Sequence, residues 1–306
     1  MTDTDFFDDA VEIATGPPRD RWGRPLLLPR EQTEETARVA YTRASSLADQ
    51  IANMTYLHTW RMRYLARGIA TNYDLALLAA AEFYTTGFER NHHDREVKRA
   101  HAASGQRLDE IIERAMDRMR IAEGADYGTA IHLFTEPGHP VQAPEQVPSA
   151  PDNETFNPQR DVESFHKALG EHGIKILATE VFTACDELRV AGTFDHLCYV
   201  PGLGIIITDK KTSKEVHGHD FKVQLSAYAN GDPYNLDDDS RMTLEQYVET
   251  LGYDPKLINR DAGLIFWIKD GKTELDLLDL QQGHEAAKVA AWVRDSGRSL
   301  CRRGTS

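Results

Sequence analysis

One stretch, residues 188–228, constrains the fold of this 306-residue chain more than any other. A β-rich run over 188–200 leads into Pro201-Gly202, and a short apolar run over 203–208 follows. A proline-glycine pair between two such runs is typical of a β-hairpin. We therefore predict two antiparallel strands here, followed by a helix over 219–230. Alternation in the first strand predicts that its apolar side chains share one face and that Asp195 lies on the other, the apolar set being Val190, Phe194, Cys198 and Val200.

The predicted hairpin brings two aspartates together, because Asp195 and Asp209 are equally far from Gly202. Directly opposed residues have Cβ atoms roughly 4.5–5.5 Å apart, and like charges at that spacing repel unless a cation lies between them. Two carboxylates so placed suit Mg²⁺ or Mn²⁺. The strand period puts Lys211 on the face of Asp209, where an ammonium can hold water or phosphorane oxygens. The hairpin therefore indicates metal-dependent hydrolysis of a phosphodiester.

The order of the polar motifs resembles that of the PD-(D/E)XK nucleases, and most closely their RecB-like branch, which includes phage exonucleases and CRISPR-associated exonucleases. The motifs are Tyr127-Gly-Thr-Ala-Ile-His132, which resembles the G-x-x-x-H motif of that branch, then Glu180, Gly192-Thr-Phe-Asp195, Asp209-Lys-Lys211-Thr212 and Gln224-x-x-x-Tyr228. The resemblance covers residues 126–230. It implies an α/β fold with a restriction-endonuclease-like core, in which helices flank a central mixed β-sheet.

The resemblance also implies roles for individual residues. The implied ligands of one or two Mg²⁺ or Mn²⁺ ions are His132, Asp195, Asp209 and the backbone carbonyl of Lys210. Lys211 would orient the attacking water, and Glu180 would lie near the metal. Gln224 and Tyr228, which share a helix face at i and i+4, would position the substrate strand. Thr212 could donate a hydrogen bond to a phosphate. For His132 and Glu180 a structural role remains the alternative, as a core histidine and half of a surface pair.

Cysteine usage and hydropathy exclude several classes of protein. The three cysteines are Cys185, Cys198 and Cys301, which form no C-x-x-C pair, so we predict no disulfide framework. Three cysteines also exclude a four-cysteine iron–sulfur cluster within one chain, which favours the cluster-free phage-type relatives. No apolar stretch is long enough for a membrane helix, and the acidic start does not resemble a signal peptide, so we expect a cytoplasmic protein.

The net charge of −14 opposes binding to nucleic acid, but the charge is unevenly distributed. Residues 58–67 carry three arginines and no acid. Of these, Arg61 and Arg63 are predicted to bind substrate phosphates, with a solvated helix face as the alternative.

The rest of the chain divides into a helical N-terminal region, 1–125, and a nuclease core, 126–300. Residues 1–30 are expected to be irregular because of their prolines, and 31–122 to be helical, with a buried helix over 73–88. Six prolines in 137–160 indicate a linker or a flap. The expected α/β core is completed by a helix capped by Asp161, a strand over 174–185 and a final helix over 281–295. Between these last two we expect strands over 262–269 and 274–280, joined by a turn at Asp270-Gly271.

The sequence therefore predicts a Mg²⁺- or Mn²⁺-dependent deoxyribonuclease, an exonuclease that acts on DNA in recombination, repair or phage DNA processing. DNA with free ends is the expected partner. A recombinase or helicase partner and an oligomer are compatible with the sequence, which contains no phosphate-binding loop of its own. The alternatives are a structure-specific endonuclease, a non-catalytic DNA-end or recombination partner with the same fold, and an enzyme that cleaves RNA.

Overall fold

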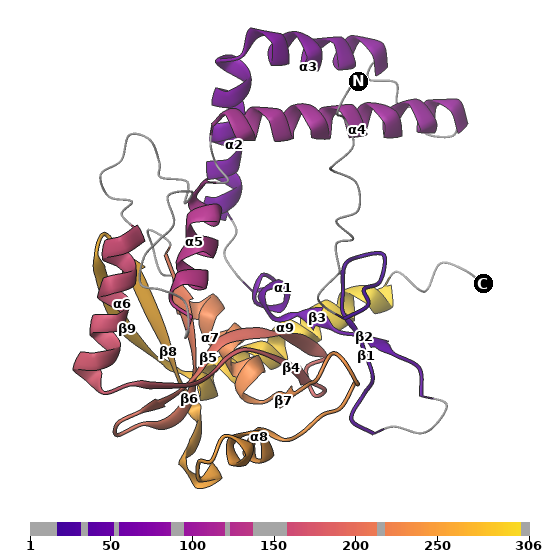
Figure 1. Ribbon diagram of the computed structural model, residues 1–306. Coiled ribbons are helices and arrows are strands. Elements are labelled where there is room, and N and C mark those ends of the chain that lie inside the picture. The colour runs from indigo at the N-terminus through magenta and orange to yellow at the C-terminus, as the bar shows by residue number, and fades with distance from the viewer. Residues whose placement is uncertain are drawn as a thin grey trace, which may run out of the picture.

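The computed structural model describes residues 17–31, 36–51, 55–86, 95–119, 123–136, 158–212 and 218–300. The chain is an α/β protein in which helices flank a central mixed sheet (Figure 1). The strands are β3 (Thr42–Arg43), β4 (Lys175–Cys185), β5 (Val190–Val200), β6 (Gly204–Lys211), β7 (Asp232–Pro233), β8 (Ile258–Lys269) and β9 (Lys272–Asp279). They follow the order β7-β4-β5-β6-β8-β9, and β3 also pairs with β5.

Two hairpins form where the sequence predicts them. β5 and β6 are joined by a turn in which Gly202 has a φ of 81°, a left-handed conformation that glycine adopts without strain. β8 and β9 are joined by Asp270-Gly271, and both residues have positive φ, as a tight hairpin turn requires. β6 and β8 are parallel, as are β3 and β5, so the sheet is mixed.

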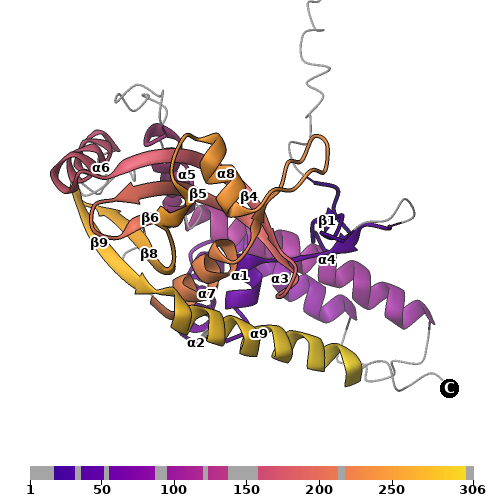
Figure 2. The same ribbon diagram turned by 90° about the horizontal axis from the view of Figure 1, so that it is seen from below.

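The helices cover the sheet on both faces (Figure 2). On one face α1 (Ala44–Ala48), α7 (Gly218–Ala229) and α9 (Leu280–Leu300) share a core with Val190 and Phe194. On the other face α5 (Glu123–Phe134) and α6 (Pro158–His172) share a core with Cys198 and Val200. The prediction that these four apolar residues of β5 share one face is therefore wrong. The change of face falls between Phe194 and Cys198, near the residue of β4 whose left-handed backbone is described below.

The N-terminal segment corrects the prediction of a continuous helix through residues 31–53. It contains β1 (Leu26–Leu27), β2 (Val39–Ala40) and β3, and of the described residues between 31 and 51 only Ala44–Ala48 are helical. Leu27 and Tyr41 are buried with Ala184, Ala191 and Tyr234 at the edge of the sheet. Packing against this edge outweighs local helix propensity, because β3 fills the position beside the start of β5 that β6 does not reach.

Three helices stand apart from the sheet: α2 (Thr55–Ala70), α3 (Tyr73–Thr86) and α4 (Arg95–Arg118) (Figure 1). They pack on one another around Leu75, Ile111 and Ala115. The prediction that the helix over 73–88 is buried is wrong, because Leu77 is 53% exposed. α3 packs on α2 and α4, and several of its apolar side chains stay outside the small core that the three helices share.

Two further elements differ from the prediction. α6 begins at Pro158, a favoured first helical residue, and Asp161 is not its cap but a buried acceptor of the Tyr127 hydroxyl at 2.7 Å. Of the linker or flap predicted over 137–160, residues 137–157 lie outside the described residues, and 158–160 are instead the first residues of α6. α8 (Leu244–Thr250) and the 3₁₀ turn η1 (Pro255–Leu257) are absent from the prediction, although Thr243 and Gln246 form a capping box. None of the helices in the described ranges is long and apolar enough to cross a membrane.

Candidate metal centre

The centre lies at a fork in the sheet. β5 and β6 pair from Val200↔Gly204 to His196↔Thr208, which is the register predicted from symmetry about Gly202. The pairing stops one step before Asp195 and Asp209, and β3 continues beside β5 from Val190 and Ala191. In place of a further pair between the main chains of β5 and β6, the Lys210 N–H donates to Asp195 Oδ2 at 2.6 Å. Both aspartates therefore lie at the point where the two strands separate.

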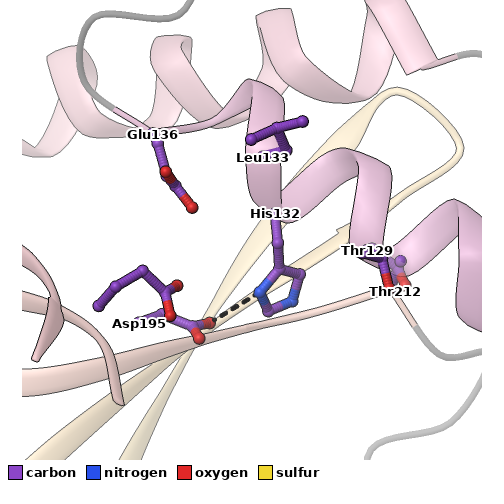
Figure 3. A pocket seen from close by; sticks show the side chains of 8 residues that line it. Thr129, His132, Leu133, Glu136, Asp195 and Thr212 are labelled. Carbon is purple, nitrogen blue, oxygen red and sulfur yellow. Dashed lines mark ion pairs between the residues drawn. The ribbon is translucent and has the colours of Figure 1, made fainter. Parts of the chain in front are cut away.

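His132 reaches this fork from the last turn of α5. Its Nδ1 lies 3.3 Å from Asp195 Oδ2, and its Nε2 lies 3.1 Å from the carbonyl oxygen of Lys210 (Figure 3). Gly128, one turn earlier, allows the helix to approach β6, because a Cβ there would lie only 2.9 Å from Thr212 Oγ1. Within the G-x-x-x-H motif, the glycine thus allows α5 to lie close to Thr212, and the histidine contacts Asp195 and Lys210.

Glu180 completes a group of three potential ligands. One ligand atom from each of His132, Glu180 and Asp195 lies within 4.8 Å of the others. Glu180 belongs to β4 and has a φ of 49°, which is left-handed and strained for a residue with a side chain. The register of the flanking pairs, Thr179↔His196 and Val181↔Phe194, sets Glu180 opposite Asp195. The strained backbone therefore coincides with the point where both carboxylates join the histidine.

The charges of the group respond to burial and to one another. Burial raises the pKa of Glu180, and the negative charge of Asp195 raises it further. Burial opposes ionisation of Asp195 too, but the hydrogen bond and charge of His132, together with Lys210, lower the pKa of Asp195 below its usual range. Asp195 is thus the carboxylate whose ionised form these neighbours stabilise, whereas for Glu180 the charges of Lys210 and His132 do not outweigh burial.

Asp209 lies on the other side of β6 from Lys210 and is almost fully buried. Its Oδ2 forms an ion pair with Lys211 Nζ. The pKa of Asp209 is raised by burial and then by the charge of Asp195, and Lys211 offsets part of this effect. The structure therefore brings Asp209 and Lys211 together as predicted. Asp209 is not among the three residues whose ligand atoms lie within 4.8 Å of one another, which are His132, Glu180 and Asp195. That the two aspartates hold one cation together stays a prediction.

The side chain and the N–H of Lys210 also belong to the site, whereas the sequence predicts a role only for its backbone carbonyl. Its side chain is fully buried, and Nζ donates to the carbonyl oxygen of His132 and to Thr135 Oγ1, both at 3.0 Å. Burial lowers the pKa of this amine, whereas the charges of nearby acids, first Asp195 and then Glu136, raise it. One residue thus ties β6 to the C-terminal end of α5 through its side chain and to Asp195 through its N–H.

The group opens into a cavity of about 570 Å³ between α5 and the sheet (Figure 3). Its lining consists of Gly128, Thr129, His132, Leu133, Glu136, Glu180, Asp195 and Thr212. Thr212 therefore borders the site, as predicted. Glu136 is absent from the prediction, although it lies one helical turn after His132, and that spacing is the signal that could have identified it.

Gln224 and Tyr228 share a face of α7, as their spacing predicts. The Gln224 amide donates to the Tyr228 hydroxyl at 3.3 Å. Tyr228 is buried beneath β5, where a Cβ on Gly192 would lie 2.9 Å from its hydroxyl oxygen. Burial raises the pKa of Tyr228, and the charges of Asp209 and Asp195 raise it further. Tyr228 thus lies close enough to Asp195 and Asp209 for their negative charges to raise its pKa.

Arg61 and Arg63 belong to α2, outside the residues that line the cavity. Both side chains are exposed. The structure therefore does not join them to the group of His132, Glu180 and Asp195.

The sequence matches no known protein-family model and no curated protein.

Proposed function

We propose that this protein is a metal-dependent deoxyribonuclease that acts from DNA ends, with a restriction-endonuclease-like core. The observation that supports this most strongly is the convergence of His132, Asp195 and the Lys210 carbonyl beside the Asp209–Lys211 ion pair. Imidazole, carboxylate and carbonyl groups form a donor set that suits Mn²⁺, and Mg²⁺ when water completes the shell. Lys211, whose side chain is partly exposed, supplies positive charge for phosphate binding.

The residues that would hold the metal are His132, Asp195, Glu180 and the carbonyl of Lys210, with Asp209 adjacent. A divalent ion bound there supplies Lewis-acid stabilisation of phosphoryl oxygens and lowers the pKa of water. The reaction adds water across one P–O ester bond and leaves a phosphate monoester and a free hydroxyl. In it, Lys211 Nζ holds the attacking water and the negative charge that develops on phosphorus-bound oxygens. Thr212, at the rim, donates to a phosphate oxygen.

The binding of metal can be tested without cleavage. We expect Mn²⁺ to raise the melting temperature of the protein, because an ion that binds only the folded state stabilises it by mass action. His132→Ala removes one ligand and should abolish most of this shift. Lys222→Ala, which changes a lysine whose Nζ contacts Gln282 on the surface, is the matched control and should leave the shift intact. A full Mn²⁺ shift in His132→Ala would contradict the assigned site.

Cleavage is tested with end-labelled linear DNA and covalently closed circles, each with Mg²⁺ or Mn²⁺ and with EDTA. We expect metal-dependent loss of the linear DNA alone, reduced at least about a hundredfold by Lys211→Ala, the scale on which loss of one charge-stabilising group acts. Cleavage of the circles would change the assignment to an endonuclease. Undiminished cleavage by a folded Lys211→Ala protein would refute the role of this site.

A further inference from the structure

A row of aromatic and arginine side chains runs along α2, away from the metal centre. Trp60, Arg63, Tyr64 and Arg67 occupy positions i, i+3, i+4 and i+7, which lie on one face of a helix. The rings of Trp60 and Tyr64 have centroids 4.7 Å apart and planes inclined at 40°. The Arg67 guanidinium lies 5.8 Å from the centre of the Tyr64 ring. We call these four residues the α2 row.

The α2 row points away from the side of α2 that packs on its neighbours. Leu65, Gly68 and Ile69 face α3 and α4, and a Cβ on Gly68 would lie 2.4 Å from the carbonyl oxygen of Ala115. At about 100° per residue, the centre of the row is roughly 140° round the helix from this packed side. Both rings are half-buried and both arginines are exposed, so the row is open to a ligand.

The charge of the row is uncompensated, in contrast to that of other arginines in this region. On α4, Arg107 pairs with Glu82, and Arg114 and Arg118 pair with Asp74. In the ranges that the structure describes, neither Arg63 nor Arg67 pairs with a carboxylate, and the sequence of α2 contains no acid. A local excess of positive charge on a chain of net charge −14 is complementary to a polyanion.

We propose that the α2 row binds single-stranded DNA, with bases stacked on Trp60 and Tyr64 and phosphates held by Arg63 and Arg67. This inference rests on the proposed function for the identity of the nucleic acid. Single strands expose their base faces, which aromatic side chains stack on without regard to sequence, whereas the bases of a duplex are already stacked on one another. The row extends over roughly 10 Å of helix, enough for a short stretch of strand. It would hold the strand outside the cavity in which His132 and Asp195 lie.

Binding of fluorescein-labelled oligo(dT) tests the proposal by fluorescence anisotropy, in EDTA so that no cleavage occurs. We expect Trp60→Ala and Tyr64→Ala each to weaken binding about tenfold, as the loss of one stacked base predicts. Trp60→Phe keeps a stacking face and should restore most of the affinity. Arg63→Ala should lower the slope of log affinity against log salt by about 0.7, as for one phosphate contact on a single strand.

Arg61→Ala is the matched control, because it removes the same charge from the same helix but about 100° from Trp60 and toward the packed side. A smaller loss for Arg61→Ala than for Arg63→Ala supports the row. Equal losses for both, or no loss on removal of either ring, would overturn it in favour of diffuse electrostatic attraction. Tighter binding of blunt duplex than of oligo(dT) by the unmodified protein would also overturn it.

Hydrolysis of bis(p-nitrophenyl) phosphate, a phosphodiester too small to span the cavity and α2, separates this proposal from the proposed function. Metal-dependent hydrolysis together with unchanged oligo(dT) binding in the row variants refutes the row alone. If the row variants lose oligo(dT) binding but the unmodified protein hydrolyses neither bis(p-nitrophenyl) phosphate nor DNA, the proposed nuclease is refuted. The protein would then be a single-strand binding protein.

Discussion

Replacement of Lys210 by methionine tests the structural link between β6 and α5. The ammonium is fully buried and donates to the His132 carbonyl and to Thr135 Oγ1. Hydrogen bonds from a charged donor contribute about 1.5–3 kcal/mol each, but removal of the charge also recovers the cost of its burial. Thr135 Oγ1 also donates to the His132 carbonyl, so this carbonyl keeps a partner, whereas Thr135 Oγ1 loses the donor that Lys210 provides. We therefore expect a net loss of about 2–3 kcal/mol in the free energy of unfolding.

The assay is urea unfolding in EDTA, followed by circular dichroism. With a denaturant slope of about 3 kcal/mol per molar, the midpoint should fall by roughly 0.7–1 M. Lys222→Met is the control and should change the free energy by less than about 0.5 kcal/mol, as is usual at the surface. A Lys210→Met protein as stable as the control would refute the inference that this buried amine holds α5 in place.

Further predictions concern close contacts and one buried thiol. Gly68→Ala places a Cβ 2.4 Å from the Ala115 carbonyl oxygen, so amide hydrogen exchange should accelerate in α2 and α4 and remain unchanged in the sheet. Gly192→Ala places a Cβ 2.9 Å from the Tyr228 hydroxyl and should destabilise the protein by about 1–3 kcal/mol in thermal unfolding, whereas an unchanged melting temperature would contradict the described contact. Burial raises the pKa of the Cys185 thiol to about 11, so at pH 8 it is protonated and should react with a thiol reagent only after unfolding; rapid labelling of native Cys185 would refute this.

The sequence predicts the sheet and its hairpins well because their signals are local. Pro201-Gly202 and Asp270-Gly271 lie between alternating apolar runs, and the structure has a hairpin at each. The register follows from the turn, so the approach of Asp195 and Asp209 is predictable to within one pair. The position of His132 in a helix follows from its apolar neighbours and from the family resemblance.

The features that escaped prediction depend on contacts between distant segments. Thr42 and Arg43 form a strand beside the distant β5, and Val39 and Ala40 form one beside β1. The strained φ of Glu180 and the path of the Lys210 side chain into α5 arise from packing that no spacing in the sequence encodes. Phe194 and Cys198 pack in the cores on opposite faces of the sheet, although strict alternation would put them on one face. Local patterns therefore identify the chemical groups, and tertiary packing determines how those groups are oriented.

The pairing of β3 with β5 has a consequence for synthesis of the chain. Thr42 pairs with Val190, so the N-terminal strand leaves the ribosome long before its partner does. At 5–20 residues per second the delay is roughly 7–30 s. The contacts among α2, α3 and α4 are local by comparison and can form during this interval. Translation therefore favours an order in which the helical segment folds first. β3 can pair with β5 only after residues 190 and 191 have been synthesised.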